Sequence, residues 1–288
     1  MHLPALPPRP DDGHKGTFGS VCVIGGQRSE DGVVMVGAPT LTANAAMRSG
    51  CGKALLAMPQ PVLQSGLTLA PNTTGIELPV DEVGRLLPSA AIEALDAHAV
   101  GCRALAIGPG FGANWPQQQM VSTLLSRDDR PVVMDADGLN ALSQLESAQL
   151  DIQAPLILTP HIGEYHRLAT AVGIETESAE ALAQAYGCVV VLKSHMTTIS
   201  DGVRTERYEE GGVELATGGS GDVLTGIIVG LLAQSGVDCM SHLFDAAVLG
   251  VYIHGLAGSA YASDFGNRGM LATDLLERIP AAIATLRT

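Results

Sequence analysis

The sequence contains few aromatic and few basic residues. Only 3% of its 288 residues are Phe, Trp or Tyr, and 16 Lys and Arg stand against 30 Asp and Glu. Because nucleic-acid affinity comes mainly from clustered Lys and Arg, the net charge of -14 argues against a nucleic-acid partner. Any anionic ligand must therefore be held locally, by backbone amides and one or two cations.

Signals for export and for a membrane span are also lacking. No basic segment followed by an apolar run opens the chain, and no uninterrupted apolar run reaches the roughly 18 residues of a span, since the best late segment carries Asp245 and His254. We therefore expect a cytoplasmic protein with no membrane partner. Thiols in a reducing compartment are expected for the five widely spaced cysteines, Cys22, Cys51, Cys102, Cys188 and Cys239.

Short aliphatic segments alternate with segments of helical periodicity along most of the chain. The expected strands are 20–26, 53–58, 103–110, 131–138, 155–161 and 188–194. The expected helices between them are 38–50, 89–99, 115–126, 162–173 and 178–187. Repeated βα units predict an α/β fold, a doubly wound and mostly parallel sheet with helices on both faces. One domain over 1–288 is expected, with the Pro-rich residues 1–13 as a loose arm.

The last third of the chain changes character. A hairpin is expected over 196–212, followed by helices over 222–234, about 243–262 and about 271–286. Apolar residues in the first of these helices form one stripe at helical spacing, which predicts a buried helix. Gly226 and Gly230 lie within it and would allow a neighbouring helix to approach closely.

A glycine-rich turn, GGSGD at 218–222, comes directly before this apolar helix. Consecutive glycines let the amides of 218–221 converge, and the positive N-terminal end of the helix adds to them, so the turn predicts a binding site for a nucleotide phosphate. The turn is not a Walker loop, since G-x-x-x-x-G-K-[ST] is absent from the sequence. It is not the dinucleotide fingerprint either, because it follows a hairpin instead of the first strand of a βαβ unit.

Asp222 closes this turn, and two interpretations of it stay open. One is a plain helix N-cap. The other is a general base, since a carboxylate is a poor ligand for phosphate but can take a proton from a hydroxyl that attacks phosphorus.

Other polar residues follow the expected strands, where a doubly wound sheet binds its ligands. His161 and Glu164 share a helix face, either as a helix-terminal pair or as contacts to a polar substrate and to water-bound Mg²⁺. Lys193 ends a buried strand and needs a phosphate or a carboxylate partner. For Asp135, Asp137 and Asn140, a turn with a helix N-cap and a ligand site are equally supported. Four other histidines are expected to have hydrogen-bond partners within the protein or to be solvated: His98, His166, His242 and His254.

The order of these motifs resembles that of the ADP-dependent NAD(P)H-hydrate dehydratases, a ribokinase-like family. The resemblance runs from about residue 14 to residue 279, over HKGTFGSVCVIGG, NAAMRSGCG, IGPGFG, PVVMDADGLNAL, LILTPHIGEYHRL, VVLKSHMT and ATGGSGDVLTGIIVGLLAQ. Some members carry a preceding epimerase domain, and this chain resembles the stand-alone form. The resemblance thus implies a separate epimerase as functional partner and a homo-oligomer, as large as a tetramer.

The resemblance implies repair of a damaged cofactor. Hydrated NADH or NADPH carries an extra ring hydroxyl, which a nucleotide phosphorylates, and loss of phosphate restores the ring. By resemblance Asp222 is the base, and the anion hole is Gly218, Gly219, Ser220 and Gly221. The co-substrate ADP would contact Lys193, Ser194, His195, Met196, Thr197 and Gly221. The hydrate would contact Ala38, Gly110, His161 and Asp222. Glu164 takes the position of a Glu linked to Mg²⁺ through water.

Three segments depart from the family pattern. KSHMT at 193–197 replaces the usual K-G-A-G-T and places bulkier side chains at the nucleotide, and Gly212-Val-Glu214 replaces N-P-G. SEDGVVMVGAPT at 29–40 is more polar at its start than the common T-G-A-A pattern. Two alternatives to the dehydratase therefore stay open: a kinase of the same fold acting on a vitamin-precursor alcohol, and a nucleotide sensor without catalysis.

Overall fold

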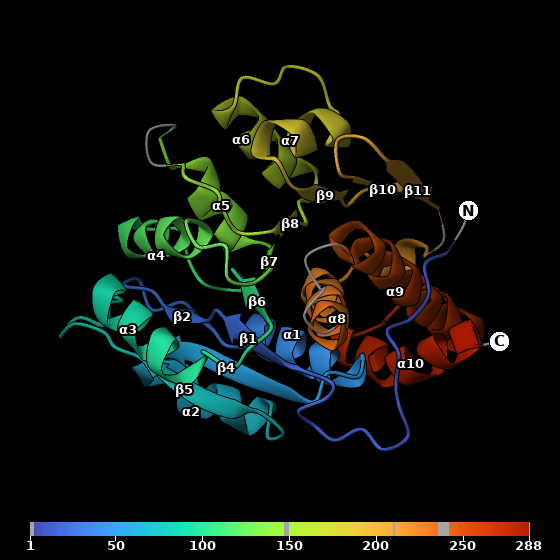
Figure 1. The fold of residues 1–288 in the computed structure, drawn as a ribbon, viewed down its shortest axis with the longest axis horizontal. Helices are drawn as coiled ribbons and strands as arrows, with labels where there is room; N and C mark the ends of the chain where they lie inside the picture. Colours follow the sequence, from blue (N-terminus) through green and yellow to red (C-terminus); the bar gives the residue numbers. More distant parts are fainter. Residues whose placement is uncertain (1–2, 147–149, 210, 236–241, 288) are drawn as a thin grey trace.

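A nine-stranded sheet forms the centre of the computed structural model, which describes residues 3–146, 150–209, 211–235 and 242–287 (Figure 1). The strand order is β11-β10-β9-β8-β7-β6-β1-β4-β5. Pairing is parallel except for β10, which is antiparallel to β9 and β11. The strands are β1 Ser20–Ile24, β4 Lys53–Pro59, β5 Thr74–Leu78, β6 Ala104–Ile107, β7 Val132–Met134, β8 Leu156–Leu158, β9 Val189–Leu192, β10 Thr197–Ser200 and β11 Thr205–Tyr208.

Helices cover both faces of this sheet (Figure 1). One face packs against α1 Gly37–Arg48, α2 Gln60–Leu69, α8 Ser220–Gln234, α9 Leu243–Phe265 and α10 Ala272–Ala284. The other face packs against α3 Pro88–His98, α4 Trp115–Leu125, α5 Asp137–Ser143, α6 Ile162–Ala171 and α7 Ala179–Tyr186. Successive strand residues point to opposite faces, so Val21 belongs to the first core and Cys22 to the second. The predicted α/β, mostly parallel sheet is confirmed.

The predicted strands and helices are all present, with several ends shifted by one to four residues. Five of the helices and strands were not predicted: α2, β5, α5 and the two strands of a small hairpin, β2 Gln27–Arg28 and β3 Val34–Met35. Each of these is short, or carries Gly or Pro, as in QPVLQSGLTL and TGIEL. Local periodicity is therefore weak, and packing on the sheet decides their structure.

Helix α8 is buried on nearly every side, as predicted. Its two internal glycines lie against α1, because a Cβ on Gly226 would be 2.3 Å from the Thr42 carbonyl oxygen and one on Gly230 would be 2.2 Å from Ser49 Oγ. The helix starts at Ser220, two residues before the predicted position, so the glycine-rich turn runs directly into its first turn. Here the structure corrects the predicted boundary.

The N-terminal segment passes along α9 and α10 without a helix or strand in its described residues (Figure 1). Leu3 and Leu6 are partly buried against the core, and Arg9 donates a hydrogen bond to the Gly50 carbonyl at 2.8 Å. Cys22, Cys51, Cys102 and Cys188 are buried free thiols, and Cys239 lies outside the described residues.

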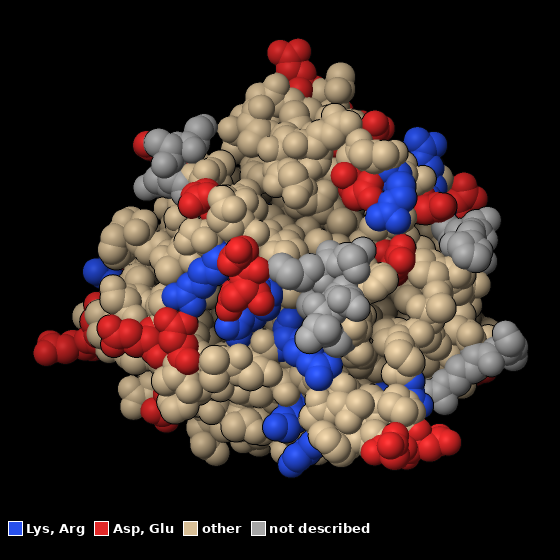
Figure 2. All heavy atoms as spheres, in the orientation of Figure 1, with Lys and Arg blue, Asp and Glu red and all other residues tan. Residues whose placement is uncertain are grey.

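Among the described residues one helix, α9, is by length and composition apolar enough to cross a membrane. The run of 18 residues that passes this test is 67% buried inside the protein, as in a core helix. The expectation concerned uninterrupted apolar runs, and α9 passes only this looser test, because it carries Asp245 and His254. On the face drawn in Figure 2, basic side chains are interspersed with acidic ones.

Candidate active site

A cleft of about 670 Å³ lies at the carboxyl ends of β7, β8 and β9, where the first turn of α8 meets them. Ten of the residues proposed for the site line it: His161, Glu164, Lys193, Ser194, His195, Thr197, Gly219, Ser220, Gly221 and Asp222. Asp135, Tyr208 and His254 complete parts of its wall. Residues far apart in the sequence thus converge where a doubly wound sheet binds its ligand.

Lys193 has a carboxylate partner at the floor of this cleft. Its Nζ donates to Asp135 Oδ1 at 2.7 Å, and Thr225 Oγ1 on α8 donates to Asp135 Oδ2 at 2.8 Å. Burial would raise the pKa of Asp135, but the charge of Lys193 and these hydrogen bonds hold it below its usual range. Burial by itself would lower the pKa of Lys193, but the negative charges of Asp135 and Glu164 outweigh burial and raise this pKa. Both groups are therefore charged at neutral pH.

Asp222 lies beside this ion pair in a different state. Its carboxylate has no hydrogen-bond or ion-pair partner among the described residues, although it lines the cleft. Burial, and next the negative charge of Asp135, raise its pKa to about 7, against the opposing charge of Lys193. A carboxyl group that titrates near neutral pH and faces an open cleft suits a general base.

The N-cap interpretation of Asp222 was wrong. The N-cap of α8 is Gly219, at φ 90° and ψ -11°, and no side chain caps the helix there. Asp222 is the third helical residue, one turn further along the chain. Its side chain is therefore free for a ligand.

The glycine-rich turn presents backbone donors to the cleft. The N–H groups of Gly219 and Gly221 have no acceptor among the described residues, as expected for the start of a helix. Gly221 lies next to the ion pair, since a Cβ there would be 3.2 Å from Lys193 Nζ. We call this part of the cleft the anion corner, because an anion there would contact the N–H groups of Gly219 and Gly221 and the ammonium group of Lys193.

His161 and Glu164 form a capping box at the start of α6. His161 Nδ1 accepts the N–H of Gly163 and Glu164, and Glu164 Oε2 accepts the N–H of His161 at 2.8 Å. The helix-terminal interpretation thus holds, and both side chains also line the cleft. Glu164 is buried, which raises its pKa despite the charge of Lys193.

Four proposed residues do not line this cleft: Ala38, Gly110, Met196 and Gly218. Ala38 and Gly110 lie together at its β6 side, where a Cβ on Gly110 would be 3.5 Å from the Ala38 Cβ. The turn at 135–140 is the start of α5, with Asp137 accepting the Gly112 N–H at 2.8 Å and Asn140 donating to Asp137.

His254 is a site residue that the sequence prediction missed. It was expected to be satisfied or solvated, and its Nε2 does lie 3.0 Å from both Ser220 Oγ and the Ser220 carbonyl oxygen. Burial lowers its pKa to about 4, so the ring is neutral. It joins α9 to the first turn of α8 at the wall of the cleft. No local motif marks it, because its partner lies 34 residues away.

Among the described residues, no group of three or more His, Cys, Asp and Glu side chains could hold a metal ion directly. Asp135 is committed to Lys193 and Thr225. Glu164 Oε1 has only a 3.4 Å contact to His161 Nε2, so it can still accept hydrogen bonds from water around an ion.

The mostly parallel sheet, with a corner of free backbone amides and an unpaired carboxylate at its carboxyl edge, defines a ribokinase-like α/β protein. Solved structures agree on the fold: a ribokinase-like protein of Enterococcus faecalis matches with a TM-score of 0.79 and 25% identity, covering 98% of this chain and 92% of that one. The NAD(P)H-hydrate dehydratase family model matches residues 21–281, and the chain belongs to this family.

Named relatives agree with this assignment. An ADP-dependent (S)-NAD(P)H-hydrate dehydratase of Neisseria meningitidis is 37% identical over 93% of this chain and 86% of its own length. The bifunctional NAD(P)H-hydrate repair enzyme Nnr of Moorella thermoacetica is 39% identical over 98% of this chain and 52% of its own length. The chain thus spans about half the length of the bifunctional relatives. An ADP/ATP-dependent dehydratase of Bacillus subtilis, co-crystallised with ATP/Mg²⁺, matches with a TM-score of 0.76 and 28% identity, covering 98% and 95% of the two chains.

Proposed function

We propose that this protein dehydrates hydrated NADH and NADPH, with ADP as phosphoryl donor. The observation that carries the proposal is Asp222: a half-buried, unpaired carboxylate with a pKa of about 7, beside the free amides of a helix start and the Lys193–Asp135 ion pair. The 37% identical relative named as an ADP-dependent dehydratase supports the substrate and the donor.

Asp222 takes the proton of the hydrate hydroxyl in this mechanism. The hydroxyl oxygen then bonds to the terminal phosphorus of ADP, and the bond from that phosphorus to the bridging oxygen breaks, releasing AMP. The lone pair of the ring nitrogen next expels the phosphate as the carbon–oxygen bond breaks. Loss of a proton from the adjacent ring carbon restores the dihydronicotinamide. Phosphate leaves far more easily than hydroxide, which is why the transfer lowers the barrier.

The anion corner holds the moving phosphoryl group. The amides of Gly219 and Gly221 donate to its oxygens, and Lys193 balances part of its charge. ADP lies along residues 193–197, with Ser220 and Gly218 completing the turn. His161 faces the hydrate. We assign these roles from their places on the cleft and its β6 side.

Magnesium fits this site only through water. Glu164 Oε1 has a contact of only 3.4 Å to His161 Nε2 and can still accept hydrogen bonds from water, and Mg²⁺ keeps several of its waters when bound. The ion would supply positive charge to the phosphates. The co-crystallisation of the Bacillus subtilis relative with ATP/Mg²⁺ supports Mg²⁺ as the ion.

Purified protein with ADP and Mg²⁺ should restore the near-ultraviolet absorbance of dihydronicotinamide from hydrated NADH, and release orthophosphate. Absence of recovery with either ADP or ATP would refute the proposal. A stable phosphorylated product would instead indicate the kinase, which the dehydratase relatives do not favour. A sensor would bind nucleotide with no turnover in either assay.

We also propose a cytoplasmic homo-oligomer, with a separate epimerase as functional partner. The buried thiols support a reducing compartment. Light scattering should give a multiple of the 29.7 kDa chain mass, and four times that mass for a tetramer. A mass of one chain would refute it.

A further inference from the structure

A second cleft, which we call the hairpin pocket, lies at the same edge of the sheet. It encloses about 610 Å³ between residues 27–31 of the β2–β3 hairpin, Pro59 at the end of β4, residues 83–86 before α3 and residues 114–117 at the start of α4. In Figure 1 β2, α3 and α4 gather at the left of the molecule. The phosphoryl transfer proposed above uses none of these residues.

Gln117, on the α4 wall of this pocket, has an unsatisfied polar atom. The residue is only 7% exposed, and its Oε1 is buried without a hydrogen-bond partner among the described residues. Its Nε2 donates to the Phe111 carbonyl at 3.1 Å. This hydrogen bond fixes the orientation of the amide, so that Oε1 remains without a donor. A buried acceptor without a donor is unfavourable, so an amino or hydroxyl group of a ligand would be stabilised there after a small side-chain shift.

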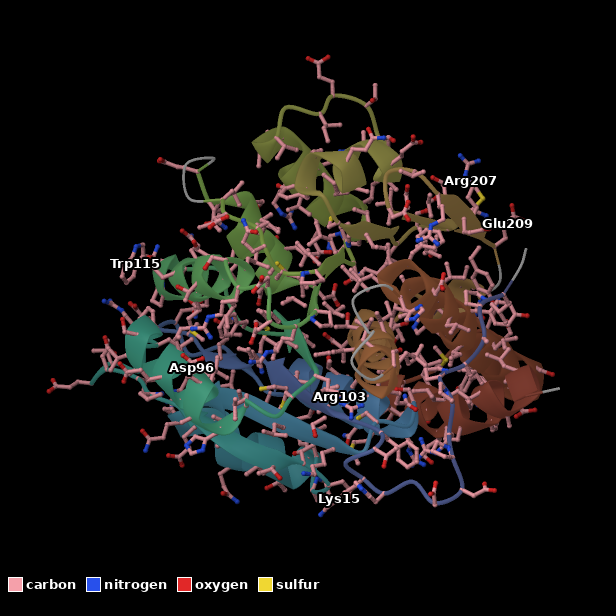
Figure 3. All side chains as sticks on the ribbon, in the orientation of Figure 1. Lys15, Asp96, Arg103, Trp115, Arg207 and Glu209 are labelled. Carbon is pink, nitrogen blue, oxygen red and sulfur yellow. The ribbon has the colours of Figure 1, made fainter. Side chains whose placement is uncertain are left out.

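Trp115 and Arg28 add an aromatic surface and a positive charge to the pocket. Trp115 is 64% exposed and projects from the start of α4 (Figure 3). Nucleic-acid bases stack on such rings. Arg28 forms no ion pair with any described residue, whereas the neighbouring Arg85 is bound to Glu30 at 2.5 Å. The pocket thus combines a stacking surface with a cation free for phosphate.

The loop after β6 connects the two clefts. A Cβ on Gly112 would be 2.4 Å from Gln27 Oε1 in the hairpin pocket, and one on Gly108 would be 2.0 Å from the Asp135 carbonyl oxygen in the candidate active site. Gly110 and Ala38 lie on this path, which explains why they are outside the first cleft. Strands β7 and β4 are three strand spacings apart in the sheet, which is roughly 14 Å. This distance is similar to the separation of the two nucleosides in a dinucleotide, where a pyrophosphate joins them.

We propose that the hairpin pocket binds the adenosine half of the hydrated dinucleotide. The base stacks on Trp115, a hydroxyl or amino group donates to Gln117 Oε1, and a phosphate pairs with Arg28. The proposal rests on the proposed function, because only a dinucleotide substrate has a second nucleoside to place here. The nucleotide co-substrate stays on the opposite side, along residues 193–197.

Trp115 is the only tryptophan of the chain, so its fluorescence reports this pocket without catalysis. ADP-ribose, added to protein already saturated with ADP, should quench it saturably, while ribose 5-phosphate, which lacks the base, should not. Arg28→Gln should weaken the ADP-ribose affinity about fivefold. No quenching, or equal quenching by ribose 5-phosphate, would overturn the proposal.

Turnover of a shortened substrate tests the same pocket in the reaction. Trp115→Ala should raise the KM for hydrated NADH about tenfold, and leave its kcat and the KM for ADP unchanged. The hydrate of reduced nicotinamide mononucleotide lacks the adenosine half, so its KM should not respond. Phe265→Ala is the matched control, since this residue is a 67% exposed aromatic on α9.

The outcomes separate the two proposals. If Trp115→Ala raises the KM of both hydrates equally, or that of ADP, the pocket assignment is wrong and the dehydratase stands. If neither hydrate is turned over, the dehydratase fails. The fluorescence titration then still decides whether the pocket binds adenosine.

Discussion

Replacing Asp222 by Asn should abolish most of the turnover and at the same time stabilise the fold. As the base, Asp222 contributes about 10²- to 10⁴-fold to the rate, and Asn cannot accept the proton. Nucleotide binding should persist, because the anion corner is built from amides and Lys193. Stopped and continuous assays of hydrate turnover measure the loss of rate. Calorimetric titration of ADP measures whether nucleotide binding is kept.

The stabilisation follows from the pKa. A rise from the ordinary 3.8 to about 7 is worth about 4 kcal/mol, since each pKa unit corresponds to about 1.36 kcal/mol. Between these two values the folded chain binds more protons than the unfolded chain, so stability falls as pH rises from 4 to 7 and is level above 7. Asp222→Asn removes this loss. We expect a gain of about 2 kcal/mol at neutral pH or above, because the buried amide keeps a desolvation cost of its own.

Urea denaturation of both proteins between the two pKa values measures this gain as a function of pH. The exposed Asp128 offers a matched control, since Asp128→Asn should change neither activity nor the pH dependence of stability. A gain that does not grow with pH would refute the burial argument. Full turnover by Asp222→Asn would refute the role as base.

Four further outcomes follow from the same geometry. The kcat/KM for hydrate should fall with acid below an apparent pKa of about 7, because the base must be ionised; a flat profile would contradict this. Lys193→Met should cost about 3–5 kcal/mol of unfolding free energy by leaving Asp135 buried and unpaired, and adding Asp135→Leu should recover part of it in urea melts. His254→Leu should lower kcat/KM about tenfold through loss of the Ser220 contact, and His254→Gln should restore part of it. Gly226→Val should destabilise the protein by about 3 kcal/mol in thermal melts, whereas Gly101→Ala, with open space around it, should be neutral.

The fold class was predictable because strands and helices of this chain carry strong local patterns. Aliphatic runs such as VVVL and the apolar stripe of α8 each identify one element without knowledge of the rest. Their alternation then leaves few topologies. Short elements were not predictable: β5 and α2 carry Gly or Pro, and α5 looks like a turn until β6 and β7 place it.

The site was predictable where a motif carries its own chemistry. Lys193, the glycine-rich turn and Asp222 were chosen from local sequence, and they meet at one cleft. His254 and Thr225 were missed, because no sequence motif distinguishes a functional imidazole or hydroxyl within an apolar helix. Their importance depends on partners from other elements, Ser220 and Asp135.

The sequence by itself determined the class of fold, the family resemblance and the residue types of the candidate site. Only the tertiary structure decided that Asp222 is not a cap, that Asp135 neutralises Lys193, and that Asp222 is therefore the carboxylate left unpaired. The reason is physical: a pKa depends on burial and on charges brought close by folding, and neither is written in local sequence. The hairpin pocket is likewise a product of four chain segments that meet only in the folded protein.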